Sequence, residues 1–218
     1  MGTGLTVRES CWMDERGEAF PLGFFDRADP TPDSVFYEPV RLVTHIDDDA
    51  IAGVGALYDE LALTGDVLDL MGSWVSHFRS VPSSLTVLGM NAIELARNQE
   101  AQSWVLHDLN FDPRLPFADE SFDAVVCCAS VDYLTRPVDV FTDAARVVRP
   151  GGYFVCTFSN RCFPTKAIRG WLNADDAGRC AIVARYFELS GRWATPVVQR
   201  RPTPPASDPL YALWASRR

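Results

Sequence analysis

The sequence has little positive charge, few histidines and no long apolar run. Lysine and arginine together number 20 against 29 aspartates and glutamates, so the formal net charge is −9 over 218 residues. A nucleic-acid-binding face needs a surplus of Lys and Arg, and we therefore expect no nucleic-acid partner. No apolar stretch approaches the ~20 residues of a membrane-spanning helix, so we expect no membrane partner either.

The six cysteines follow no metal-binding or redox spacing. No two of them are separated by two residues, so we predict neither a zinc site nor a thioredoxin-like motif, and no other metal. Cys127 and Cys128 lie in an apolar run and are expected to be buried. This usage, with no signal-peptide pattern at the N-terminus, predicts a cytoplasmic protein. Gly2 and Thr6 match the loose myristoylation pattern, but no polybasic segment follows them.

Apolar runs alternate with helical patterns along most of the chain. Residues 1–35 are punctuated by Pro and Gly and predict an irregular N-terminal arm, followed by one domain over 36–218. Within it we expect helices at 48–61, 92–98, 137–148 and 174–189, and strands at 67–70, 85–90, 103–109, 122–130, 153–159, 193–199 and 209–215. The alternation predicts an α/β fold with a mostly parallel seven-stranded sheet, helices on both faces and a terminal antiparallel hairpin. The acidic run at 47–49 suits a helix N-terminus.

Polar side chains follow four successive strands of this predicted sheet. They are Asp69, Asn91, Asp108 and Ser130. In an open parallel sheet, ligands bind beyond the carboxyl ends of the strands. Any one of these residues alone is more typical of a helix or turn cap, but four at one edge favour a ligand site.

The strongest motif is the stretch LPFADESFDAVVCCASVDYLTRPVDVFTDAARVVRPGGYFVCTFSN at 115–160. Together with VLDL before the first loop and HDLN after the third strand, it resembles the class I S-adenosylmethionine-dependent methyltransferases, in the branch similar to the quinone-biosynthesis C-methyltransferases. The resemblance covers roughly residues 60–160. It implies a Rossmann-like fold, S-adenosyl-L-methionine as cofactor and in-line methyl transfer to a small-molecule substrate. It also divides the domain into a cofactor half at about 62–160 and a substrate-side half at about 161–218, in a monomer or homodimer.

The resemblance assigns cofactor-binding roles to the residues at the strand ends. These are Asp69, Met71, Gly72, Ser73, Asn91, Asp108, Leu109, Ala129 and Ser130. Asp69 and the loop after it would lie against the methionine moiety. Asn91 takes the place of the acidic residue that holds the ribose, and Asp108 would accept a hydrogen bond from the adenine amino group. Ala129 and Ser130 would line the floor near the sulfonium.

The first loop departs from the family pattern D-x-G-x-G-x-G. Met71, Ser73 and Val75 occupy the glycine positions, and Gly72 is displaced between two of them. Because a β-branched residue fits poorly at positive φ, we expect the chain to enter a helix early, with Ser73 as N-cap. The helix amides would then face the cofactor carboxylate.

The altered loop keeps other functions open. One is a protein of this fold that binds S-adenosylmethionine or its product without methylating, for structural or regulatory reasons or for another reaction. Another is a nicotinamide-dependent oxidoreductase, but DLMGSWVSH does not supply the G-x-G-x-x-G loop that this function needs.

Candidate reactive side chains are few. Those that could act as a base or position the substrate are His45, His77 and Tyr37, although a structural role is more common for such residues. The expected substrate pocket consists of Trp74, Tyr133, Asn160, Arg161 and Phe163. Arg161, Lys166 and Arg169 are candidates for recognising an acidic substrate group, with a solvated helix face as the alternative reading.

Overall fold

A computed structural model of the chain describes residues 20–218. The predicted arm is therefore described only from residue 20, and both the myristoylation pattern at Gly2 and Thr6 and Cys11 lie outside the described residues. At the centre is a seven-stranded sheet in the order β3-β2-β1-β4-β5-β7-β6. Its strands are β1 (Asp66–Leu70), β2 (Ser84–Gly89), β3 (Ser103–Leu106), β4 (Phe122–Cys128), β5 (Val148–Phe158), β6 (Val197–Arg201) and β7 (Leu210–Ser216).

The pairing of the strands confirms the predicted fold class. Strands β1 to β5 pair in parallel, whereas β7 lies antiparallel between β5 and β6, so the chain ends in the expected hairpin. The helices are α1 (Asp33–Phe36), α2 (Asp48–Glu60), α3 (Ala92–Leu95), α4 (Pro137–Val147), α5 (Arg169–Leu172) and α6 (Asp176–Ser190), with a 3-10 turn η1 (Val131–Tyr133). Each helix of residues 20–218 is too short or too polar to span a bilayer.

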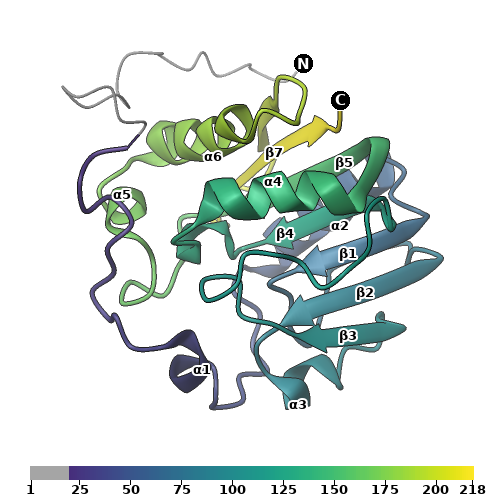
Figure 1. Cartoon of the computed structure of the whole chain (residues 1–218), viewed down its shortest axis with the longest axis horizontal. Coiled ribbons are helices and arrows are strands. Elements are labelled where there is room, and N and C mark those ends of the chain that lie inside the picture. The colour runs from purple at the N-terminus through teal and green to yellow at the C-terminus, as the bar shows by residue number, and fades with distance from the viewer. Residues whose placement is uncertain (1–19) are drawn as a thin grey trace.

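Two hydrophobic layers enclose the sheet because successive side chains of a strand point to opposite faces. In β1, Leu68 and Leu70 join the layer under α4 and α6, whereas Val67 joins the layer under α2. Figure 1 shows α4 and α6 together on one side of the sheet. The acidic run caps α2 as expected, since the Asp47 carboxylate accepts a hydrogen bond from the Ala50 N–H.

The connection between β1 and β2 contains no helix. The prediction of an early helix capped by Ser73 is therefore wrong. Side chains from a later segment hold this loop instead. The Asn98 amide donates to the Ser73 carbonyl and to the Ser76 hydroxyl, at 3.0 and 2.9 Å. The Glu100 carboxylate accepts from the backbone N–H groups of Ser76 and Phe78. These bonds satisfy backbone groups that a helix would have paired internally.

Residues 20–47 form a segment that we call the strap. It runs along the edge of the sheet where the parallel strands end (Figure 1). The Lys166 ammonium is fully buried and lies 3.2 Å from carboxylate oxygens of both Asp29 and Asp33. Arg27 makes a second ion pair with Asp33 at 2.7 Å, and Asn110 donates to the same carboxylate. The strap is thus tied by paired, buried charges to the loops that follow β3 and β5.

Candidate functional site

A pocket opens at the carboxyl ends of β1 to β4, next to the strap. About 1150 Å³ of empty space lies within it, including open solvent at its mouth. Most of the sequence-predicted site residues line it together: Tyr37, His45, Asp69, Met71, Gly72, Ser73, Trp74, His77, Asn91, Asp108, Leu109, Ala129, Ser130, Tyr133 and Phe163.

Two predicted substrate-pocket residues lie elsewhere. Asn160 and Arg161 are exposed and do not line this pocket, and the Arg161 guanidinium pairs with Asp208 at 2.7 Å. The other cations considered for an acidic substrate are also paired, Lys166 inside the strap cluster and Arg169 with Asp26 at 3.1 Å. Each of these charges already has a carboxylate partner in the protein, so none of them is left for a substrate.

The first loop makes its tight turn without the family's glycines. Met71 occupies the first glycine position and has a φ of 58°, in the left-handed region that glycine favours. Gly72 follows and donates its N–H to the Leu88 carbonyl at 3.0 Å. A Cβ at Gly72 would stand 2.6 Å from Asp69 Oδ2, so only glycine fits there. The loop therefore crosses β2 closely by using one strained methionine and one glycine.

Asp69 is the penultimate residue of β1, beneath this loop, and is 3% exposed. Burial raises the pKa of its carboxyl to about 7, while the Ser76 hydroxyl lowers it by hydrogen bonding and the Glu100 charge raises it further. Near neutral pH, Asp69 is therefore divided between its charged and its neutral form. The structure places it as a buried support of the loop as well as a pocket residue.

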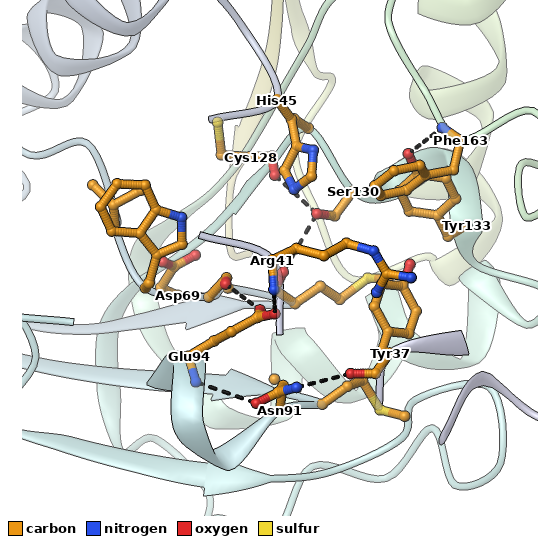
Figure 2. A pocket seen from close by; sticks show the side chains of 18 of the residues that line it. Tyr37, Arg41, His45, Asp69, Asn91, Glu94, Cys128, Ser130, Tyr133 and Phe163 are labelled. Carbon is orange, nitrogen blue, oxygen red and sulfur yellow. Dashed lines mark hydrogen bonds between the residues drawn. The ribbon is translucent and has the colours of Figure 1, made fainter. Parts of the chain in front are cut away.

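Asn91 lines the pocket, but its amide is already fully used. Its Oδ1 accepts from the N–H groups of Ile93 and Glu94 and so caps α3. Its Nδ2 donates to the carbonyls of Tyr37 and Glu38 in the strap (Figure 2). An amide offers two donors and two acceptor positions, so this side chain has none left for a ribose hydroxyl.

Glu94 is a pocket residue that the sequence analysis missed. Its Oε1 accepts from the Arg41 backbone N–H and its Oε2 from the Ser73 hydroxyl, each at 2.6 Å. A carboxylate has about four lone-pair positions, so it can accept further bonds from a ligand. Glu94 follows Asn91 by three residues, and this spacing on one helical turn was the signal that could have identified it.

Asp108 stands at the far side of the pocket after β3. Its Oδ1 accepts from the backbone N–H groups of Asn110 and Phe111. Among residues 20–218, its Oδ2 receives no hydrogen bond, and Leu109 beside it is buried. This half-buried carboxylate therefore has one oxygen for a donor of a ligand, next to an apolar surface.

The candidate bases all line the pocket, and each is held in its uncharged form near neutral pH. The His45 ring stacks edge-on to Phe163 at 5.2 Å, and desolvation there lowers its pKa although one side stays exposed. Burial lowers the pKa of His77 to about 4. Burial, followed by the Asp33 charge, raises the pKa of Tyr37 above its usual range. At neutral pH both imidazoles are uncharged and Tyr37 is a phenol.

Aromatic side chains form the wall next to β4 and β5. Tyr133 and Phe163 lie with ring centroids 6.0 Å apart, and the Phe163 N–H donates to the Tyr133 hydroxyl at 2.8 Å. Trp74 is fixed by its indole N–H, which donates to the Val43 carbonyl of the strap. Figure 2 shows His45 pointing into the pocket toward Ser130, with Tyr133 and Phe163 beside it.

Sequence comparison gives matches over the middle of the chain. Residues 72–156 match a family described as "Methyltransferase domain". A ubiquinone/menaquinone biosynthesis C-methyltransferase of Desulfotalea psychrophila is 35% identical over 114 residues, which is 48% of this chain and 41% of that protein. A demethylmenaquinone methyltransferase of Mycobacterium sp. (strain KMS) is 50% identical over 56 residues, 24% of each protein. The matched part thus spans less than half the length of these relatives.

Solved structures with the same fold are also methyltransferases. A possible histamine N-methyltransferase of Thermotoga maritima matches with a TM-score of 0.56 and 11% identity, covering 78% of this chain and 88% of that one. A methyltransferase of Mesorhizobium loti matches with a TM-score of 0.51 and 16% identity, covering 74% of this chain and 98% of that one. Such low identities support the fold alone. The sequence matches show that the middle of the chain is similar to methyltransferase domains, including those of quinone-biosynthesis C-methyltransferases, and the structure matches show the same fold, here with an atypical glycine-poor first loop.

Proposed function

We propose that this chain binds S-adenosylmethionine in the pocket and transfers its methyl group to a small molecule. The observation that carries the proposal is the pocket itself. It opens at the strand ends where this fold binds ligands, and predicted cofactor residues from four different strands meet in it.

The lining residues fit the parts of the cofactor. Asp108 has an oxygen for the adenine amino group, and Leu109 supplies an apolar contact. Glu94, rather than the fully bonded Asn91, would hold the ribose hydroxyls. Met71, Gly72 and Ser73 would lie against the methionine moiety, as the family pattern implies. Ala129 and Ser130 would form the floor near the sulfonium.

The chain's own contribution to the reaction is orientation, exclusion of water and proton transfer. The bound cofactor supplies an electrophilic methyl group. The strap and Trp74 cover the site, and the aromatic wall of Tyr133 and Phe163 offers an apolar surface to the acceptor. His45 is uncharged near pH 7 and points into the pocket, so it is the best placed side chain to accept a proton at an imidazole nitrogen. His77 and Tyr37 would position the acceptor.

The compartment forms part of the same proposal. The five cysteines of the described residues are all unpaired. Free thiols persist in a reducing environment, so we propose that the protein is cytoplasmic.

Calorimetry with S-adenosylhomocysteine, the product form of the cofactor, tests the binding. We expect Asp108→Ala to lower its affinity by about 1–3 kcal/mol, because a hydrogen bond to a charged group is lost. Asp59→Ala, at an exposed position of α2, is the control and should bind as the wild type does. An unchanged dissociation constant for Asp108→Ala would show that the adenine lies elsewhere.

Methylation is tested separately from binding. The loop after β1 offers no helix amides to the cofactor, so the alternative of a protein that binds the cofactor without methylating is tested alongside. The wild-type protein is incubated with methyl-labelled S-adenosylmethionine and a panel of small acceptors, and label transfer is measured. Transfer to an acceptor supports the methyltransferase. Tight binding of S-adenosylhomocysteine with no transfer across the panel supports the alternative.

A further inference from the structure

Within residues 20–218, Arg41 is the one Arg or Lys side chain that lines the pocket. Among residues 20–218 its guanidinium makes no ion pair, and its one hydrogen bond is donated by Nη1 to the Pro39 carbonyl at 3.2 Å. Every other cation that the sequence suggested for this purpose is paired with a carboxylate. An unpaired, half-buried guanidinium in a ligand pocket has donors left for an anion.

The position of this guanidinium is fixed before any ligand binds. Its Cζ lies 4.6 Å from the centroid of the Phe36 ring and 5.8 Å from that of Phe163. Its backbone N–H is held by Glu94 at 2.6 Å. Stacking on aromatic faces leaves the edges of a guanidinium free, and its planar fork matches the two oxygens of a carboxylate. Arg41 is therefore preorganised for a planar anion.

The acidic residue of the strap that lines the pocket does not compete for this charge. Asp33 lines the pocket, but its carboxylate is already bound by Arg27, Lys166 and the Asn110 amide. Figure 2 shows the Arg41 side chain extending away from Glu94 toward Tyr37, on the side of the pocket where Tyr133 and Phe163 lie. The Arg41 guanidinium thus lies beside the aromatic wall and points away from Glu94, the residue assigned to the ribose.

We propose that the acceptor substrate is a planar, apolar carboxylic acid whose carboxylate is bound by Arg41 and whose body packs against Phe163 and Tyr133. This inference rests on the proposed function, since it assigns the aromatic wall to the acceptor. His45 contacts the same Phe163 ring, so the proton acceptor and the anion site flank one surface. The cofactor also carries a carboxylate, and the experiment must separate these two sources.

The first arm of the experiment identifies whose carboxylate Arg41 binds. Affinities for S-adenosylhomocysteine, which has a carboxylate, and for 5′-methylthioadenosine, which lacks one, are measured by calorimetry for the wild type and for Arg41→Gln. We expect both affinities to change less than twofold. A tenfold loss for S-adenosylhomocysteine alone would assign Arg41 to the cofactor and overturn this inference while supporting the proposed function.

The second arm uses 2-naphthoate and the uncharged 2-naphthamide as probes, with S-adenosylhomocysteine present. We expect the wild type to bind the naphthoate about tenfold more tightly, because the hydrogen bonds to its carboxylate are charge-assisted. Arg41→Gln should abolish this preference while still binding the amide. Arg41→Lys should keep part of it, and Arg97→Gln, an exposed site with the same charge change, should keep all of it.

Equal affinity of the wild type for the two probes would overturn the inference, as would a preference that survives in Arg41→Gln. Should Arg41→Gln fail to fold, Arg41→Lys decides, since a preference unchanged from the wild type would show that the stacked fork is not the anion site. Failure of wild-type protein to bind S-adenosylhomocysteine would contradict the proposed function instead. In that case the affinities for the two probes are compared without S-adenosylhomocysteine, and a preference for the naphthoate still tests the role of Arg41.

Discussion

The connection between β4 and β5 and the connection between β1 and β2 each join two parallel strands of the sheet, but they differ in structure. The segment between β4 and β5 contains η1 and the helix α4, whereas the segment between β1 and β2 contains no helix. Each leads from the carboxyl end of one parallel strand to the start of another, and each contributes to the pocket. The comparison shows how much of this fold depends on a helical apolar stripe and how much on individual polar contacts.

The difference follows from the residues. In α4, Val140, Phe141, Ala144 and Val147 are fully buried on one face, and Pro137 stands in the first turn where its missing N–H costs nothing. The segment MGSWVSHFRSVPS at 71–83 has no such stripe and is rich in serine. Serine hydroxyls compete for backbone groups, so this loop relies on Asn98 and Glu100 for its hydrogen bonds.

The largest expected effect lies on the helical side of the comparison. Phe141 is fully buried, and its ring packs against Phe154, Tyr186 and Phe187. Phe141→Ala should lower the free energy of unfolding by about 3–5 kcal/mol, because a large cavity opens in the core. Urea denaturation measures this. A loss below 1 kcal/mol would mean that α4 does not anchor this half of the sheet.

The second prediction compares two buried acids, one in β1 next to the first connection and one in η1 of the other. The pKa of Asp69 is raised by burial from 3.8 to about 7, and that of Asp132, in η1, to about 8. Between about pH 4 and these values the native state holds a proton that the unfolded state has lost. Stability therefore falls as pH rises through each window, by about 1.4 kcal/mol per pH unit at each site.

Asp69→Asn should remove the fall between pH 4 and 7, and Asp132→Asn the fall between pH 4 and 8. The measurement is the free energy of unfolding of each variant minus that of the wild type, followed over this pH range. A difference that stays constant with pH for Asp69→Asn would show that its carboxyl titrates normally in the folded protein.

The smallest effect should come from the loop side. Asn98→Ala removes the hydrogen bonds to Ser73 and Ser76 and the one accepted from the Glu100 N–H, and we expect a loss of about 1–3 kcal/mol in the free energy of unfolding. Because the loop borders the pocket, affinity for S-adenosylhomocysteine should fall as well. Asn160→Ala, at an exposed position outside the pocket, serves as the control and should change neither quantity. A loss of stability without any loss of affinity would show that the loop does not contribute to binding of S-adenosylhomocysteine.

Much of the fold was predictable because its signals are local. The apolar runs and helical spacing gave the strand sequence, the terminal hairpin and α4, and the strand-end residues Asp69 and Asp108 do line one pocket. The missing helix after β1 was not predictable from propensity, since it depends on Asn98 and Glu100, side chains that come after β2 in the sequence.

The roles of Arg41 and Glu94 were hidden for a related reason. Both lie in unremarkable sequence, and their meaning arises only when the strap meets α3 and the Arg41 N–H reaches the Glu94 carboxylate. Conversely, Arg161 and Lys166 looked available in the sequence and are paired in the structure, with Asp208 and with the strap carboxylates. Charge pairing between distant segments is a tertiary property that residue type and spacing do not encode.

The buried pairing of Lys166 with Asp29 and Asp33 has a consequence for how the protein is made. These partners are separated by more than half of the chain, so a nascent polypeptide emerging from the ribosome completes five strands of the sheet before the lysine is available. Domains assemble from the N-terminus during synthesis, and contacts this distant in sequence form late. Until then, the strand ends that form the floor of the pocket are in place, but the strap is not yet tied over them.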